Sequence, residues 1–205
     1  MKLVKVGILF VLITMSVQAQ DQQQKTILFF GDSITAGYGL EIEQAFPALI
    51  EQKIDCLGHN YRVVNAGLSG ETSAGGLRRV DWILQQPVDI FVLELGGNDG
   101  LRGIDPESTK ENLQGIINKV EETYSDAAII LAGMQAPPNM GQDYTEAFHQ
   151  MYYDLAEMND VVFLPFILEG VAGDPDLNLP DGIHPTEKGH KIVAENVWKV
   201  LEPIL

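Results

Sequence analysis

Cysteine is almost absent from this sequence of 205 residues. Cys56 stands alone, so no intrachain disulfide can form even in an oxidising compartment. His59 follows at Cys-x-x-His spacing, but one cysteine and one histidine do not complete a structural zinc site. We therefore interpret Cys56 as a small residue at the end of a helix, and we expect neither a metal site nor a cofactor.

Basic residues are also scarce. Lysine and arginine total 13 against 29 acidic residues, which gives a formal net charge of −16 at pH 7. A surface this acidic repels nucleic acids and the anionic faces of membranes. We therefore exclude both as main partners, and solubility alone is the alternative explanation for the acidity. Separately, we expect a monomer.

Hydrophobic runs are short, and one of them lies at the amino terminus. Lys2 and Lys5 form a positively charged segment before the apolar run 6–15. The residues Val17-Gln-Ala19 resemble a signal-peptidase site. Residues 1–19 are therefore predicted to be a signal peptide cleaved after Ala19, with a periplasmic or secreted destination. A retained anchor is the alternative, but the run is short for a membrane span and no stop-transfer pattern follows.

The rest of the chain is predicted to be a polar, disordered lead-in over 20–25 and one domain over 26–205. Five short apolar runs alternate with five stretches of helical periodicity, and the apolar content of 45% is ample for one core. This alternation predicts a three-layer α/β/α sandwich with a five-stranded parallel sheet. The predicted strands are 26–30, 61–65, 89–95, 127–132 and 161–164.

Three of these strands run into glycine-rich turns with polar residues. Asp32-Ser33 follows the first strand, Gly67 with Ser69 the second, and Asn98-Asp99 the third. Because the carboxyl ends of parallel strands share one edge, we expect these turns to converge. For Asp32 and Ser33 the alternative is a helix cap or Asx turn, and Asn98 alone is also consistent with a plain turn residue.

A serine nucleophile needs a base, a group that orients the base and donors for the oxyanion. His184 is the best base among four histidines, because Asp181 lies three residues earlier on a turn containing Gly182. An ordinary surface histidine before a helix is the alternative. His149 and His190 lie on predicted helices and are interpreted as solvated or packed.

Three neutral donors are candidates for the oxyanion hole: the N–H of Ser33, the N–H of Gly67 and the side-chain amide of Asn98. Glycine at 67 would let the backbone approach a ligand closely. The sequence has no Gly-x-Ser-x-Gly elbow, which argues against a standard α/β-hydrolase.

The long loop 165–185 also contains a pattern that begins like a calcium loop. Asp174, Asp176 and Asn178 alternate, but Leu179 stands where the glycine should be and Pro185 where the bidentate glutamate should be. We therefore predict no calcium site there.

Four blocks together resemble the SGNH (GDSL-type) hydrolases in order and spacing: 31–34 (GDSI), 65–70 (NAGLSG), 96–99 (GGND) and 181–184 (DGIH). Residues 63–77 and 93–103 are most similar to the periplasmic branch of arylesterases, thioesterase I and lysophospholipase L1. Ile34 replaces the leucine of the family name. The resemblance implies a flavodoxin-like sheet, a triad of Ser33, Asp181 and His184, and an oxyanion hole of Ser33, Gly67 and Asn98.

The same resemblance implies a serine esterase that hydrolyses carboxylic esters or thioesters of small to medium acyl chains through an acyl-Ser33 intermediate. A small acyl ester or thioester would be its partner. A carbohydrate O-deacetylase and a non-catalytic lipid- or sugar-binding module remain as alternatives. Four apolar residues are candidates for an acyl groove, or else pack against the core: Leu101, Ile104, Met134 and Met140.

Overall fold

A computed structural model describes residues 24–205, so the predicted signal peptide and most of the predicted lead-in lie outside the described residues. The five predicted strands are present as one parallel sheet in the order β2-β1-β3-β4-β5. Their bounds are β1 Lys25–Gly31, β2 Tyr61–Asn65, β3 Ile90–Glu94, β4 Ala128–Ala132 and β5 Val162–Leu164. Lys25 thus belongs to β1, and the predicted lead-in extends one residue too far.

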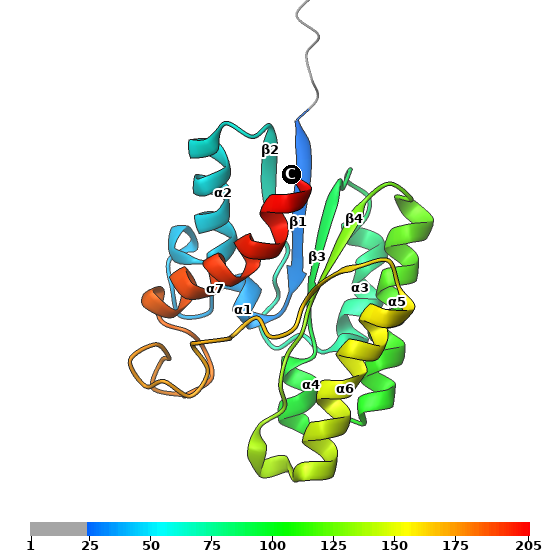
Figure 1. The fold of residues 1–205 in the computed structure, drawn as a ribbon, viewed down its shortest axis with the longest axis vertical. Helices are drawn as coiled ribbons and strands as arrows, with labels where there is room; N and C mark the ends of the chain where they lie inside the picture. Colours follow the sequence, from blue (N-terminus) through cyan, green and yellow to red (C-terminus); the bar gives the residue numbers. More distant parts are fainter. Residues whose placement is uncertain (1–23) are drawn as a thin grey trace, which may run out of the picture.

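Helices cover both faces of this sheet (Figure 1). On one face α2 packs on α7, and on the other α5 packs between α3 and α6. The described α-helices are α1 Ser33–Ala36, α2 Phe46–Leu57, α3 Ser73–Ile83, α4 Gly97–Arg102, α5 Pro106–Thr123, α6 Gln142–Met158 and α7 Glu187–Leu201. The predicted three-layer α/β/α sandwich is confirmed.

The core forms where the apolar strands meet the apolar stripes of the helices. Residues 27–30 of β1 and 91–93 of β3 are fully buried, as expected for central parallel strands that are covered on both faces. Helix α5 buries Leu113, Ile116, Ile117 and Val120, which recur at helical spacing. Within residues 24–205, no helix is both long and apolar enough to span a membrane.

Two short helices, α1 and α4, lie where the sequence predicted irregular turns. Helix α1 begins because the Asp32 side chain accepts a hydrogen bond from the Ile34 N–H, and it ends at Gly37, whose φ is 75°. Gly96, with a φ of 116°, provides the sharp turn from β3 into α4. Short helices of this kind leave no periodic apolar pattern to detect.

The strand order places these two turns at the most favourable point for a ligand. In a sheet of order 2-1-3-4-5 the chain direction across the sheet reverses between β1 and β3, and ligands bind beyond the carboxyl ends of strands at this point. Helix α1, which contains Ser33, follows β1, and α4, which contains Asn98, follows β3.

Candidate active site

Ser33 is the first residue of α1, directly after the sharp end of β1. Asp32 before it is the N-cap, and its Oδ1 accepts the Ile34 N–H at 2.9 Å. The sequence offered a cap and a reactive serine as alternatives for this dipeptide, and the structure combines a cap at Asp32 with a serine in contact with a histidine. The Ser33 side chain is largely buried, so its hydroxyl has a defined neighbour rather than free solvent.

That neighbour is His184, whose Nε2 lies 2.8 Å from Ser33 Oγ. The other ring nitrogen, Nδ1, lies 2.8 Å from Oδ2 of Asp181. These three side chains therefore form one hydrogen-bonded chain, although Ser33 and His184 lie 151 residues apart in the sequence. A hydroxyl, an imidazole and a carboxylate in this order form the geometry of a serine–histidine–aspartate triad.

Asp181 is held by the backbone of its own turn. Its Oδ1 accepts the N–H of Ile183 at 2.9 Å and the N–H of His184 at 3.0 Å. The His184 N–H, the His184 ring and the Ile183 N–H together lower the pKa of the Asp181 carboxyl to about 2. The carboxylate is therefore ionised at neutral pH and keeps the Nδ1–H tautomer of His184.

The loop that carries this turn is anchored by Asn178, which is buried. The Asn178 amide donates to the carbonyl oxygens of Val171 at 2.7 Å and Asp174 at 2.8 Å. The Leu179 N–H donates to the His184 carbonyl oxygen at 2.7 Å. Asn178 is thus occupied in holding the loop, which fixes His184 just before α7.

Tyr38 packs against the imidazole and was not singled out from the sequence. Its ring centroid lies 4.4 Å from that of His184, and the planes are tilted by 38°. The Tyr38 N–H donates to the Ser33 carbonyl oxygen at 3.0 Å. The only sequence signal was an aromatic residue between Gly37 and Gly39, close after the candidate nucleophile.

Two of the three candidate oxyanion donors belong to or contact the turn that carries Ser33: the Ser33 N–H is part of it, and the Asn98 amide is hydrogen-bonded to Asp32 of the same turn. The Ser33 N–H is at the first position of α1, where no intrahelical acceptor exists. The Asn98 amide donates one N–H to Asp32 Oδ2 at 3.1 Å, which orients the group and leaves its second N–H for a ligand. Arg102 approaches Asn98 Oδ1 at 3.5 Å.

Gly67, the third candidate donor, contacts α1 directly. A Cβ at this position would overlap the backbone of Ala36, so the close approach that requires glycine is to the protein itself. The Gly67 N–H donates to Asn65 Oδ1 at 3.0 Å, and the Asn65 amide donates to the Thr35 carbonyl oxygen at 2.8 Å. The N–H of Gly67 must therefore leave or share this acceptor to serve an oxyanion.

Buried carboxyl groups lie behind these donors. Burial raises the pKa of Asp32 to about 6, although hydrogen bonds from Ile34 and Asn98 oppose the shift. Asp99 accepts from the Ser73 N–H at 2.9 Å, from Ser73 Oγ at 2.6 Å and from Thr109 Oγ1 at 3.3 Å. Asp99 therefore ties α4 to the starts of α3 and α5 and fixes the neighbouring Asn98.

The four candidate acyl-groove residues have different environments. Met134 is buried in the core and lies beside α4. It therefore packs against the core, which was the alternative to a place in an acyl groove. Leu101, on α4, has 44% of its surface exposed. Ile104 and Met140 are half-buried, and the Ile104 carbonyl oxygen accepts the Tyr144 hydroxyl at 2.7 Å.

The remaining histidines lie apart from this chain of contacts. His190 is buried on α7, and its Nδ1 accepts the Phe46 N–H at 3.1 Å. Burial lowers the pKa of His190 to about 4, so it is neutral and structural. His149 is exposed on α6, and Cys56 is exposed near the end of α2. In residues 24–205 no group of three or more histidine, cysteine or acidic residues could hold a metal ion.

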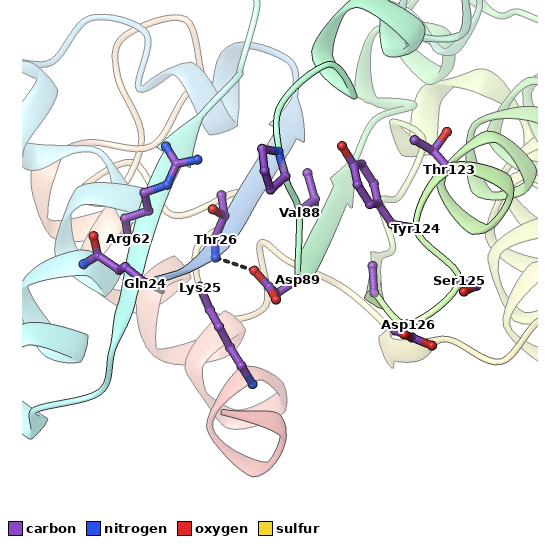
Figure 2. A pocket seen from close by; sticks show the side chains of 12 residues that line it. Gln24, Lys25, Thr26, Arg62, Val88, Asp89, Thr123, Tyr124, Ser125 and Asp126 are labelled. Carbon is purple, nitrogen blue, oxygen red and sulfur yellow. Dashed lines mark hydrogen bonds between the residues drawn. The ribbon is translucent and has the colours of Figure 1, made fainter. Parts of the chain in front are cut away.

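A cavity of about 630 Å³ lies at the opposite edge of the sheet, around the amino ends of β1, β3 and β4 (Figure 2). Lys25, Arg62 and Asp126 are among its lining residues. Asp89 Oδ2 accepts the Thr26 N–H at 2.8 Å, which joins β1 to the start of β3. This cavity is therefore separate from the triad, which lies at the carboxyl edge.

Residues 29–192 match the model of the GDSL-like Lipase/Acylhydrolase family. The chain belongs to this family. It is 42% identical to Esterase TesA of Pseudomonas aeruginosa over 187 residues, with 91% of this chain and 92% of TesA covered. It is 39% identical over 196 residues to Thioesterase 1/protease 1/lysophospholipase L1 of Escherichia coli, covering 95% of this chain and 90% of that one.

Solved structures of the GDSL-like acylhydrolases share the fold. The psychrotrophic esterase EstA from a Pseudoalteromonas species, in a structure inhibited by monoethylphosphonate, superposes with a TM-score of 0.82 at 32% identity. That alignment covers 87% of this chain and 97% of EstA. The family predicted from the four sequence blocks is confirmed.

Proposed function

We propose that this GDSL-like acylhydrolase is a serine esterase that hydrolyses carboxylic esters or thioesters through an acyl-Ser33 intermediate. The observation that carries the proposal is the unbroken chain from Ser33 Oγ through His184 to Asp181, with both links at 2.8 Å. The relatives named esterase and thioesterase support the same reaction class.

In the first step Ser33 Oγ bonds to the acyl carbon while its proton passes to His184 Nε2. The imidazolium that forms is stabilised by Asp181, which stays ionised. The carbonyl oxygen becomes an oxyanion, for which the donors are the Ser33 N–H, the free N–H of Asn98 and, once released from Asn65, the N–H of Gly67.

Collapse of the tetrahedral intermediate expels the alkoxide or thiolate, and His184 returns the proton to it. Water then attacks the acyl-Ser33 carbonyl carbon as His184 removes its proton, and a second collapse releases the acid and restores the serine. No other group is needed to balance protons in this cycle. Because Asn98 is a neutral donor, it stabilises the oxyanion without adding a counter-charge to the site.

The substrate class follows from the rim of this site. Large apolar side chains remain exposed on the segments next to the proposed triad and oxyanion donors: Tyr38, Leu68, Leu101 and Ile183. An acyl chain would cover part of this surface, which favours apolar acyl groups over strictly acetylated substrates. A series of p-nitrophenyl esters from acetate to palmitate tests this, since activity confined to acetate would contradict an apolar acyl site.

Labelling with a fluorophosphonate probe tests the nucleophile. We expect the wild type to be labelled and Ser33→Ala to remain unlabelled. Ser69→Ala is a matched control, because Ser69 is an exposed serine in the neighbouring Gly67 turn and should leave labelling unchanged. Equal labelling of wild type and Ser33→Ala would contradict the assignment.

We also propose that residues 1–19 direct export and are removed after Ala19, so that the esterase acts outside the cytoplasm as a monomer. Cell fractionation and amino-terminal sequencing of the exported protein test this. The expected first residue is Gln20, whereas a retained Met1 in a membrane fraction would indicate an anchor.

A further inference from the structure

Glu94, the last residue of β3, lies beneath the turn that carries the nucleophile. Its side chain is completely buried. Its Oε2 accepts three hydrogen bonds from that turn: from Thr35 Oγ1 at 2.7 Å, from the Asp32 N–H at 3.2 Å and from the Thr35 N–H at 3.3 Å. Asp32, directly before Ser33, and Thr35, two residues after it, are thus tied to one oxygen atom.

Gly31 makes this arrangement possible. A Cβ at position 31 would overlap both Thr35 Oγ1 and Glu94 Oε2. The carboxyl group therefore packs directly against the backbone where β1 turns into α1, and any other residue at 31 would push it away.

Several features favour the neutral form of Glu94. Burial, with the nearby charge of Asp32, raises the pKa of Glu94 well above its ordinary value, although the hydrogen bonds from Thr35 and Asp32 oppose the shift. Its Oε1 is buried and has no partner within residues 24–205, and none of the interactions described for Glu94 is with a basic side chain. Tyr152, the titratable group facing it from α6, donates its hydroxyl to the Leu95 carbonyl oxygen at 2.7 Å. An ionised Glu94 would be a buried, unpaired charge.

We infer that Glu94 is a positioning residue whose neutral carboxyl group holds the nucleophile turn through Oε2, so that the Ser33 hydroxyl and N–H stay aimed at one carbonyl. This inference rests on the proposed esterase function. A neutral acceptor suits the task, because Asp32, with a pKa of about 6, is mostly ionised at pH 7 beside the Asn98 donor. A second carboxylate at Glu94 would add to the repulsion of the oxyanion that forms there.

Infrared difference spectroscopy in D₂O at pH 7 tests the charge state without depending on activity. Subtracting the Glu94→Gln spectrum from that of wild type should leave the carbonyl stretch of an un-ionised carboxylic acid. Glu71→Gln is a matched control: Glu71 is also buried but forms an ion pair with Arg79 at 2.6 Å, so its difference spectrum should show carboxylate bands. Carboxylate bands in the Glu94 difference spectrum would overturn the inference.

Kinetics test the positioning role. Misplacing a nucleophile by about 1 Å can cost up to about 10²-fold in rate, so Glu94→Ala should lower kcat by that order with KM little changed. Glu94→Gln keeps a neutral oxygen acceptor and should recover most of the loss. A glutamine variant as impaired as the alanine variant, or a loss confined to KM, would overturn the role.

A milder variant provides a second test in case Glu94→Ala does not fold. Thr35→Val preserves the shape of a buried side chain and removes the 2.7 Å hydroxyl donor alone. Its kcat should fall less than that of Glu94→Ala, and unchanged kcat in a folded Thr35→Val would also contradict the inference. If wild type itself hydrolyses no ester, the esterase proposal fails, while the infrared result still decides the state of Glu94.

Discussion

The two edges of the sheet differ in what they offer a ligand: the amino edge has the described cavity, and the carboxyl edge has the contacting polar side chains. The amino edge has a cavity of about 630 Å³, yet the hydrogen bond described there, from Thr26 to Asp89, joins one strand to the next (Figure 2). The carboxyl edge brings a hydroxyl, an imidazole and a carboxylate into hydrogen-bond contact. We therefore place the proposed chemistry where the strand ends meet and the strand order reverses, rather than in the cavity at the amino edge.

Paired substitutions at the two edges give the largest expected contrast. Ser33→Ala removes the nucleophile and should lower kcat by roughly 10⁶-fold, as loss of a triad serine does elsewhere. Arg62→Ala changes the lining of the amino-edge cavity and should leave kcat and KM unchanged. Steady-state hydrolysis of a p-nitrophenyl ester measures both. A large loss in Arg62→Ala with the fold intact would mean that the amino edge takes part.

Asp181→Asn should have the next largest effect. The amide would still accept from the Ile183 and His184 N–H groups but would favour the wrong tautomer of the imidazole, and kcat should fall by about 10⁴-fold. The wild-type pH profile should show no step from Asp181 above pH 4, because the lowered pKa of about 2 keeps this carboxyl group ionised there. A loss below about tenfold would show that His184 needs no orienting carboxylate.

Asn98→Ala removes one oxyanion donor and should lower kcat by about 10²–10³-fold, with a modest change in KM. The contact is made mainly in the transition state, so ground-state binding should survive. The same ester assay, fitted for kcat and KM separately, checks this. A large rise in KM with kcat intact would assign Asn98 to substrate binding.

The smallest effect concerns stability. Burial raises the pKa of Asp32 to about 6, above the value of about 4 expected in the unfolded chain. The folded state therefore binds the Asp32 proton more tightly than the unfolded state does. Protonated Asp32 contributes to the free energy of unfolding below about pH 4, and this contribution is lost as pH rises through about 6. Urea unfolding of wild type and Asp32→Asn at pH 4 and pH 7 should show the wild type losing more stability. Parallel pH dependences would contradict the shift.

The fold and the candidate triad were accessible from sequence because both depend on local patterns. A buried parallel strand reads as a short apolar run, and the turn after it reads as glycine with polar residues. The pairing of Asp181 with His184 is also local, since the hydrogen bonds of the turn lie within three residues. Only the meeting of Ser33 with His184 required the fold.

The features missed are those that depend on distant partners. Glu94 lies inside an apolar strand, and nothing in its neighbours shows that Asp32 and Thr35 reach it from another strand end. Tyr38 touches His184 across the fold. Gly67 also meets a requirement that its own turn does not reveal, because a Cβ at this position would overlap the backbone of Ala36 from the other turn.

We propose that the N–H groups of Ser33 and Gly67 and the Asn98 amide all donate to the oxyanion that forms when Ser33 attacks the acyl carbon. A crystal structure of the protein inactivated by an alkylphosphonate tests this directly. We predict phosphorus bonded to Ser33 Oγ, with one phosphoryl oxygen about 2.7–3.1 Å from all three nitrogens and the Gly67 N–H released from Asn65. A phosphoryl oxygen that points to solvent, or an adduct on another residue, would contradict the account.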